Sequence, residues 1–220
     1  MHIEFIDLFR CPRPHEESVL VAVFERRDGR LLVDGWLTCP VCDARYRVAQ
    51  GVAYFSDPAG EEGVARAPAR ATGGEDPDPA ALSEAEEASD ALRLGAMLGI
   101  PQSGGVVVLE GARAASAERL AQLTGARVIV WNPIRAMADQ DVVCTVFAAG
   151  AVPLAPGVAS GVAIGSSGLS PASVPIGMLR QRGRLVLPSS AIIPPGFREL
   201  ARDDVDSVSE KIGELVTLRR

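Results

Sequence analysis

The chain has 220 residues, of which 47% are hydrophobic, so it is long enough for one medium domain and a small one. Its 22 basic and 28 acidic side chains give a net charge of -6, which argues against nucleic-acid binding driven by phosphate contacts. There is no run of 18 apolar residues and no basic segment after Met1, so the sequence predicts neither a membrane span nor a secretion signal. We therefore expect a cytoplasmic protein without a membrane partner.

The N-terminal quarter has the pattern of short strands. Apolar and β-branched residues recur over Val19–Phe24, Leu31–Thr38 and Tyr46–Phe55, and Asp28-Gly29 between the first two is a turn signal. These features predict a small β-rich domain over residues 1–56.

Two short clusters in this domain carry metal-ligand chemistry. Cys39-Pro-Val-Cys42 is a turn that aims two thiolates at one point, and Cys11 with His15 offers a second, looser pair. Together they predict a structural zinc site with four protein ligands, which leaves no open position for catalysis.

Alternatives to parts of this site stay open at the sequence level. His2 or Glu16 could replace His15 as the fourth ligand, and a disulfide between Cys39 and Cys42 is a rival to metal binding. The cysteines could also be small buried hydrophobes, which is our interpretation of Cys144 in its apolar run.

Residues 57–81 are rich in Pro, Gly, Ala and acidic side chains without apolar periodicity, which is typical of a solvated linker. A capping box beginning at Ser83 predicts a helix that Gly99 and Pro101 end. The second domain is therefore expected over residues 82–220.

This second domain begins with a βαβ pattern. Gly105–Glu110 and Arg127–Trp131 are apolar runs typical of strands buried on both faces, and between them lies a helix over Ser116–Thr124 with Gly125 as its C-cap. The short crossover requires parallel strands.

The rest of the domain supplies further elements. We expect strands over Val142–Phe147, Gly161–Ile164 and Arg184–Leu187, a helix around Pro171–Arg180, and a tail containing a helix from Phe197 followed by a turn and a final strand or helix. The predicted class is α/β: a Rossmann-like, mostly parallel sheet preceded by a small β-rich zinc ribbon.

The N-terminal domain resembles a known family. The segments FIDLFRCP (5–12), LTCPVC (37–42) and YRVAQGVA (46–53) are similar to the small zinc-ribbon proteins that activate methyltransferases, which end in a Y-P-I-x-x-G-I-P motif. In this chain Arg47 replaces the proline of that ending, and Pro14-His15 stands where the family has its second cysteine.

The C-terminal domain resembles class I S-adenosylmethionine-dependent methyltransferases in its order of elements and in the segments VPLA (152–155) and LRQRGRLVL (179–187). The resemblance implies a cofactor site at Glu110, Gly111 and Asn132. The family needs a glycine-rich loop and a carboxylate that binds the ribose, and this chain has Ala112-Arg113 in that loop and the amide of Asn132 at the carboxylate position.

These departures lead to our first hypothesis, a zinc-binding protein whose degenerate, non-catalytic methyltransferase-like domain serves as an interaction or regulatory partner. The second is an active methyltransferase on RNA or a small molecule, with S-adenosylmethionine in a divergent pocket. The third is a Rossmann-like domain for another ligand. We expect a protein partner first, and RNA bound through the ribbon second.

Overall fold

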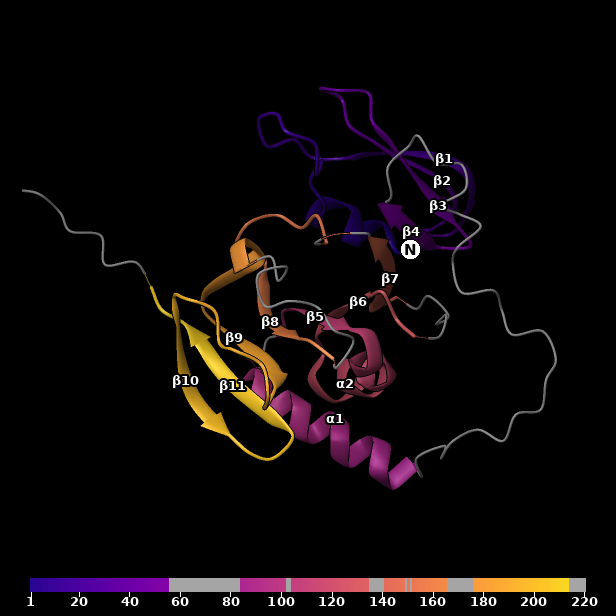
Figure 1. Cartoon of the computed structure of the whole chain (residues 1–220). Helices are drawn as coiled ribbons and strands as arrows, with labels where there is room; N and C mark the ends of the chain where they lie inside the picture. Colours follow the sequence, from indigo (N-terminus) through magenta and orange to yellow (C-terminus); the bar gives the residue numbers. More distant parts are fainter. Residues whose placement is uncertain are drawn as a thin grey trace, which may run out of the picture.

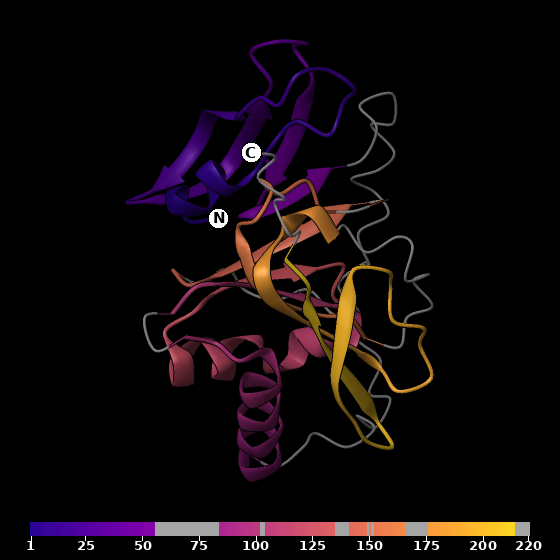
Figure 2. The same cartoon turned by 90° about the vertical axis from the view of Figure 1, so that its left-hand side faces the viewer.

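The computed structural model describes residues 1–55, 84–101, 104–134, 141–148, 150, 152–165 and 176–213; the expected linker over 57–81 lies outside them. The described strands form one eleven-stranded sheet in the order β1-β2-β3-β4-β7-β6-β5-β8-β9-β11-β10 (Figure 1). The cysteine-rich N-terminal part lies at one end of this sheet and the C-terminal hairpin at the other (Figure 2).

The N-terminal part is a ribbon of four antiparallel strands that follow a short 3-10 helix. Its elements are η1 (Ile3–Leu8), β1 (Val21–Asp28), β2 (Leu31–Thr38), β3 (Arg45–Ala49) and β4 (Val52–Phe55). The single strand expected over Tyr46–Phe55 is wrong, because Gln50 and Gly51 adopt positive φ angles of 50° and 84° and turn the chain back on itself.

The second part has the Rossmann-like arrangement expected from the sequence. Helix α1 (Glu84–Leu98) comes first. The parallel strands and the helices between them follow: β5 (Val106–Glu110), η3 (Gly111–Ser116), α2 (Ala117–Thr124), β6 (Arg127–Trp131), β7 (Val143–Ala148), β8 (Ala159–Ala163), η5 (Ile176–Met178) and β9 (Leu179–Pro188). The order β7-β6-β5-β8-β9 is that of a doubly wound sheet whose winding reverses between β5 and β8. The predicted α/β class is thus confirmed.

The two faces of this parallel sheet pack against different cores. In β5, Val107 and Leu109 belong to the core that contains the buried residues of α1 and α2, whereas Val106 and Val108 belong to the core that contains Phe5. Both faces are therefore covered, which explains why the strand is apolar at every position. No described helix is long and apolar enough to cross a membrane.

Two expectations for the C-terminal third are wrong. Of the helix predicted around Pro171–Arg180, the described residues form the short η5 and the start of β9, because Leu179 pairs with Ala159 of the neighbouring strand. The helix expected from Phe197 is instead the strand β10 (Phe197–Arg202), paired with β11 (Asp206–Lys211). Pairing of β11 with β9 overrides the helix propensity of the segment.

The ribbon and the Rossmann-like part are joined by strand pairing. Strand β4 runs parallel to β7, with Ala53 opposite Val146 and Phe55 opposite Ala148. The sheet therefore continues from the ribbon into the parallel strands, and the aromatic core of the ribbon is continuous with one face of the Rossmann-like part.

Candidate functional site

The four predicted zinc ligands lie together in the structure. Cys11 and His15 come from the segment between η1 and β1, Cys39 directly follows β2, and Cys42 lies in the turn before β3. Their ligand atoms all lie within 4.8 Å of one another. Two turns that are far apart in the sequence thus converge because β1, β2 and β3 form one antiparallel meander.

The spacings inside this cluster match those of a tetrahedral metal site. The sulfur atoms of Cys11 and Cys42 are 3.7 Å apart, and the Cys39 sulfur is 3.4 Å from Nε2 of His15. A tetrahedral ion with Zn–S bonds of about 2.3 Å holds its sulfur ligands about 3.8 Å apart. The donor set of three sulfurs and one imidazole nitrogen is one that zinc prefers.

Local hydrogen bonds prepare the ligands for a cation. The Val41 N–H donates to the Cys39 sulfur at 3.4 Å. Burial works to raise the pKa of Cys39, but hydrogen bonds from the backbones of Cys42 and Val41 outweigh it and lower the pKa to about 6, which favours the thiolate. Nδ1 of His15 lies 2.5 Å from the Glu16 carbonyl oxygen, so Nδ1 carries the proton and Nε2 faces the sulfurs.

The alternative ligands are placed elsewhere. His2 is buried at the start of η1, where its Nδ1 accepts a hydrogen bond from the Glu4 N–H. Glu16 meets the cluster through its backbone carbonyl. Cys144 is fully buried in β7 as a core residue, and none of the four described cysteines forms a disulfide.

The cluster is connected to the aromatic core of the ribbon. The Tyr46 hydroxyl lies 3.5 Å from the Cys11 sulfur, and the Tyr46 ring packs on Phe55 with centroids 5.0 Å apart. Phe55 in turn packs on Phe9 with centroids 5.2 Å apart. Because Phe55 belongs to β4, the predicted ligand Cys11 is connected to the strand that joins the Rossmann-like part through the Tyr46 hydroxyl and one ring contact.

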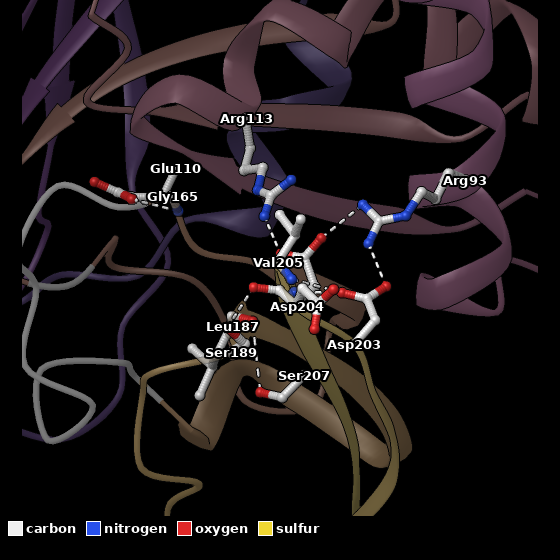
Figure 3. Close-up of polar contacts among 11 residues, drawn as sticks. Arg93, Glu110, Arg113, Gly165, Leu187, Ser189, Asp203, Asp204, Val205 and Ser207 are labelled. Carbon is white, nitrogen blue, oxygen red and sulfur yellow. Dashed lines mark hydrogen bonds and ion pairs between the residues drawn. The ribbon is translucent and has the colours of Figure 1, made fainter.

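A second candidate site is the carboxyl edge of the parallel sheet, where doubly wound folds bind their ligands at the reversal between β5 and β8. Glu110, the predicted acidic residue, ends β5 there and is 2% exposed. Its Oε2 accepts a hydrogen bond at 2.9 Å from the N–H of Gly165, the second residue after β8 (Figure 3). The carboxylate thus bridges the two strands at the reversal point.

The loops that follow these strands are in close contact. A Cβ atom on Gly165 would lie 3.0 Å from the Glu110 carbonyl oxygen and 3.1 Å from the Ala112 nitrogen. Gly111 has a φ of 60°, which turns the chain sharply from β5 into η3. Gly165 is therefore needed for the close approach of the two loops, a role that sequence reasoning missed.

Asn132, the predicted ribose-binding residue, is engaged with the backbone of the neighbouring strand. Its Nδ2 donates to the Ala148 carbonyl at 2.8 Å, and its Oδ1 accepts from the Ala148 N–H at 2.9 Å. Asn132 adopts a positive φ of 46°, which Asn tolerates better than most residues. The amide thus links the end of β6 to the end of β7.

Arg113, which sequence reasoning placed near the cofactor path, pairs with the fully buried carboxylate of Asp206 in the C-terminal hairpin. Arg93 from α1 binds the other oxygen of Asp206 at 2.7 Å. Arg93 also binds Asp203 at 2.7 Å (Figure 3). These four residues, called here the hairpin clamp, connect α1, η3 and the β10–β11 hairpin. The signal in the sequence is the group of acidic residues Asp203, Asp204 and Asp206, whose pattern by itself is that of a solvated loop.

Comparisons with solved structures show partial likeness to methyltransferases. Geranyl diphosphate methyltransferase in complex with GPP and sinefungin has a TM-score of 0.39 and 20% identity, and the match covers 47% of this chain and 45% of that one. An RNA methyltransferase from Salinibacter ruber in complex with S-adenosyl-L-homocysteine has a TM-score of 0.34 and 15% identity over 58% of this chain and 93% of that one. The chain spans about half the length of the geranyl diphosphate enzymes it matches. No family model and no curated protein matches the sequence.

Proposed function

We propose that this protein is a zinc-binding interaction or regulatory protein whose methyltransferase-like domain is non-catalytic. The observation that carries the proposal is that the groups predicted to hold a cofactor are engaged by protein: Glu110 by Gly165, and Asn132 by Ala148. A cofactor would have to displace these internal hydrogen bonds, and exchanging one set of bonds for another gains little free energy.

The zinc part of the proposal rests on the converging ligands Cys11, His15, Cys39 and Cys42. Zinc bound there would have four protein ligands and would contribute folding free energy, with no coordination position left for water. The residues themselves supply the site: the Cys39 thiolate is favoured by backbone hydrogen bonds, and His15 presents Nε2. The ribbon's fold would therefore depend on the metal.

The test combines two measurements on the full chain purified with zinc. Elemental analysis is expected to give about one zinc ion per chain. Calorimetric titration with S-adenosylmethionine is expected to give no binding heat, and the variant Glu110→Gln serves as the matched comparison at the same edge. Binding of micromolar strength that Glu110→Gln weakens would overturn the non-catalytic proposal and leave the zinc proposal intact.

The alternative is an active S-adenosylmethionine-dependent methyltransferase acting on RNA or a small molecule. The observation in its favour is that β5 ends in the carboxylate Glu110 and is followed by the positive-φ glycine Gly111, at the reversal of a doubly wound sheet. In that case the same titration gives binding, and the bound protein unfolds at a higher temperature than the free protein.

A further inference from the structure

The two edges of the eleven-stranded sheet differ in chemistry. Strand β10, at one edge, is exposed and charged, with an ion pair between Glu199 and Arg202 at 2.9 Å. Strand β1, at the other edge, exposes apolar side chains: Val21 is 52% exposed, Val23 50% and Phe24 45%. Charged side chains are a common protection of sheet edges against pairing, and this half of β1 lacks them.

The backbone of β1 is available on its outer side. Among the described residues, its ladder hydrogen bonds go to β2 alone, and the nearest other pairing is the isolated bridge between Arg10 and Val19, before the strand begins. Two bulges near Arg26 interrupt the charged half of the strand. The regular, open stretch is therefore the apolar one, up to Phe24.

The outer face beside this edge carries aromatic side chains but also fixed negative charge. Trp36, opposite Val23, donates its Nε1–H to Glu25 at 2.8 Å, and Arg47 pairs with the same carboxylate at 2.7 Å. Hydrogen bonds from Arg47 and then Trp36 lower the pKa of Glu25, which keeps it ionised. The Asp34 carboxylate forms an ion pair with Arg26, in which Oδ2 and Nε are 2.6 Å apart.

A nucleic acid on this face would bring its phosphates close to the carboxylates of Glu25 and Asp34. The net charge of -6 on the chain adds to that repulsion. The nearby arginines, Arg26 and Arg47, are already paired with them. The surface therefore favours a protein occupant over RNA.

We infer that β1 pairs antiparallel with β1 of a second copy of this chain. A two-fold axis perpendicular to the sheet keeps the two outer faces on the same side, and it places one residue of β1 opposite itself. The run Leu20-Val-Ala-Val-Phe24 is apolar throughout and centred on Ala22. With Ala22 on the axis, Val21 lies opposite Val23 of the second copy, and each apolar residue of the run meets an apolar one.

Neighbouring registers are less favourable. An axis at Val21 would place Phe24 opposite Ser18 of the second copy, outside the apolar run, and the aromatic ring would lose its apolar cross-strand partner. An axis at Val23 would place Val21 opposite Glu25. The self-complementary interface is short and is expected to be smaller than about 1,200 Å², which is the size range of transient association.

This inference names a partner for the interaction protein proposed above, and it rests on that proposal only in requiring a folded ribbon. Sedimentation equilibrium of the zinc-loaded chain over a wide concentration range is expected to show a reversible monomer–dimer equilibrium. Val23→Lys is expected to leave a monomer, since a charge at the pairing position blocks the edge. Val205→Lys, at an equally exposed valine in the distant hairpin, is expected to keep the dimer.

A cross-link tests the register. Because Ala22 lies opposite itself, Ala22→Cys is expected to form a disulfide-linked dimer under mild oxidation, whereas Val205→Cys is not. A wild-type chain that stays monomeric while carrying zinc overturns the inference and leaves the proposed function standing. Equal cross-linking of Ala22→Cys and Val205→Cys would also overturn the inference.

Titration of the chain with single-stranded oligouridine tests RNA as the alternative occupant of this surface. No binding is expected. Binding that Trp36→Ala abolishes would assign this face to nucleic acid and overturn the inference.

Discussion

The side-chain amide of Asn132 holds both backbone groups of Ala148, donating at 2.8 Å and accepting at 2.9 Å. Asn132→Asp separates the two interpretations of this position. A carboxylate cannot donate to the Ala148 carbonyl, so the folded state loses one hydrogen bond and gains a repulsion between two oxygens. We expect the free energy of unfolding to fall by about 1–3 kcal/mol.

Urea denaturation measures this loss, and calorimetry with S-adenosylmethionine on the same variant provides the second readout. If Asn132 were a weakened ribose ligand, Asn132→Asp would instead bind the cofactor more tightly than the wild type, because a carboxylate is the stronger acceptor. That result would contradict the non-catalytic proposal.

The hairpin clamp gives a second prediction. Asp206→Ala removes a buried carboxylate that pairs with two arginines, and leaves Arg93 and Arg113 without this partner. Removing one member of a buried ion pair typically costs 3–5 kcal/mol, and since both arginines are partly exposed we expect about 2–3 kcal/mol. Asp204→Ala, which changes an exposed neighbour, is the control and should be within about 0.5 kcal/mol of the wild type in the same denaturation experiment.

Asp203 makes the stability depend on pH in the acid range. Hydrogen bonds from the Asp206 backbone, from Arg93 and from the Val205 backbone lower its pKa to about 2. The unfolded chain has the ordinary value of about 3.9, so the folded state binds this proton less readily. The stabilisation is therefore fully present above about pH 4 and is lost as the pH falls through about 2.

The measurement is the difference in melting temperature between the wild type and Asp203→Asn from pH 6 to pH 2. The difference should be constant above pH 4 and shrink toward pH 2. A difference that stays constant over the whole range would show that the ion pair with Arg93 does not act on stability.

The sequence predicted those elements whose formation depends on the pattern of their own residues. The apolar run of β5 and the Gly125 cap of α2 follow from residue pattern, since strands buried on both faces and left-handed C-caps leave direct signals. The hairpin β10–β11 was missed because its stability comes from pairing with β9, and the segment from Phe197 has good helix formers. Tertiary pairing outweighs such weak local preferences.

The long-range contacts left no readable signal. The pairing of β4 with β7 joins residues about ninety positions apart, and Arg93 meets Asp206 across 113 positions. Each partner by itself has the pattern of an ordinary strand residue or a solvated charge. For the cysteine cluster the reverse holds: turn geometry and ligand spacing indicated Cys39 and Cys42, and the meander brought Cys11 and His15 to them.

Removal of the zinc ion that we propose should unfold more than the ribbon. Cys39→Ser replaces the thiol whose pKa the backbone lowers to about 6, and a hydroxyl is a poor zinc ligand at neutral pH. We expect zinc content to fall to near zero. The ring contacts from Tyr46 to Phe55 should then loosen, and because Phe55 lies in β4, the parallel pairing with β7 should weaken as well.

Two measurements check this coupling: hydrogen exchange of the β7 amides, and elemental analysis of the zinc content of the same samples. Cys144→Ser alters a buried cysteine within β7 itself and should keep its zinc, which separates metal loss from a local packing defect. Chelation of the wild-type protein should reproduce the Cys39→Ser exchange pattern. If β7 stays protected after zinc is removed, the ribbon folds and unfolds independently of the parallel sheet, and the strand pairing at Ala53 and Val146 carries no coupling.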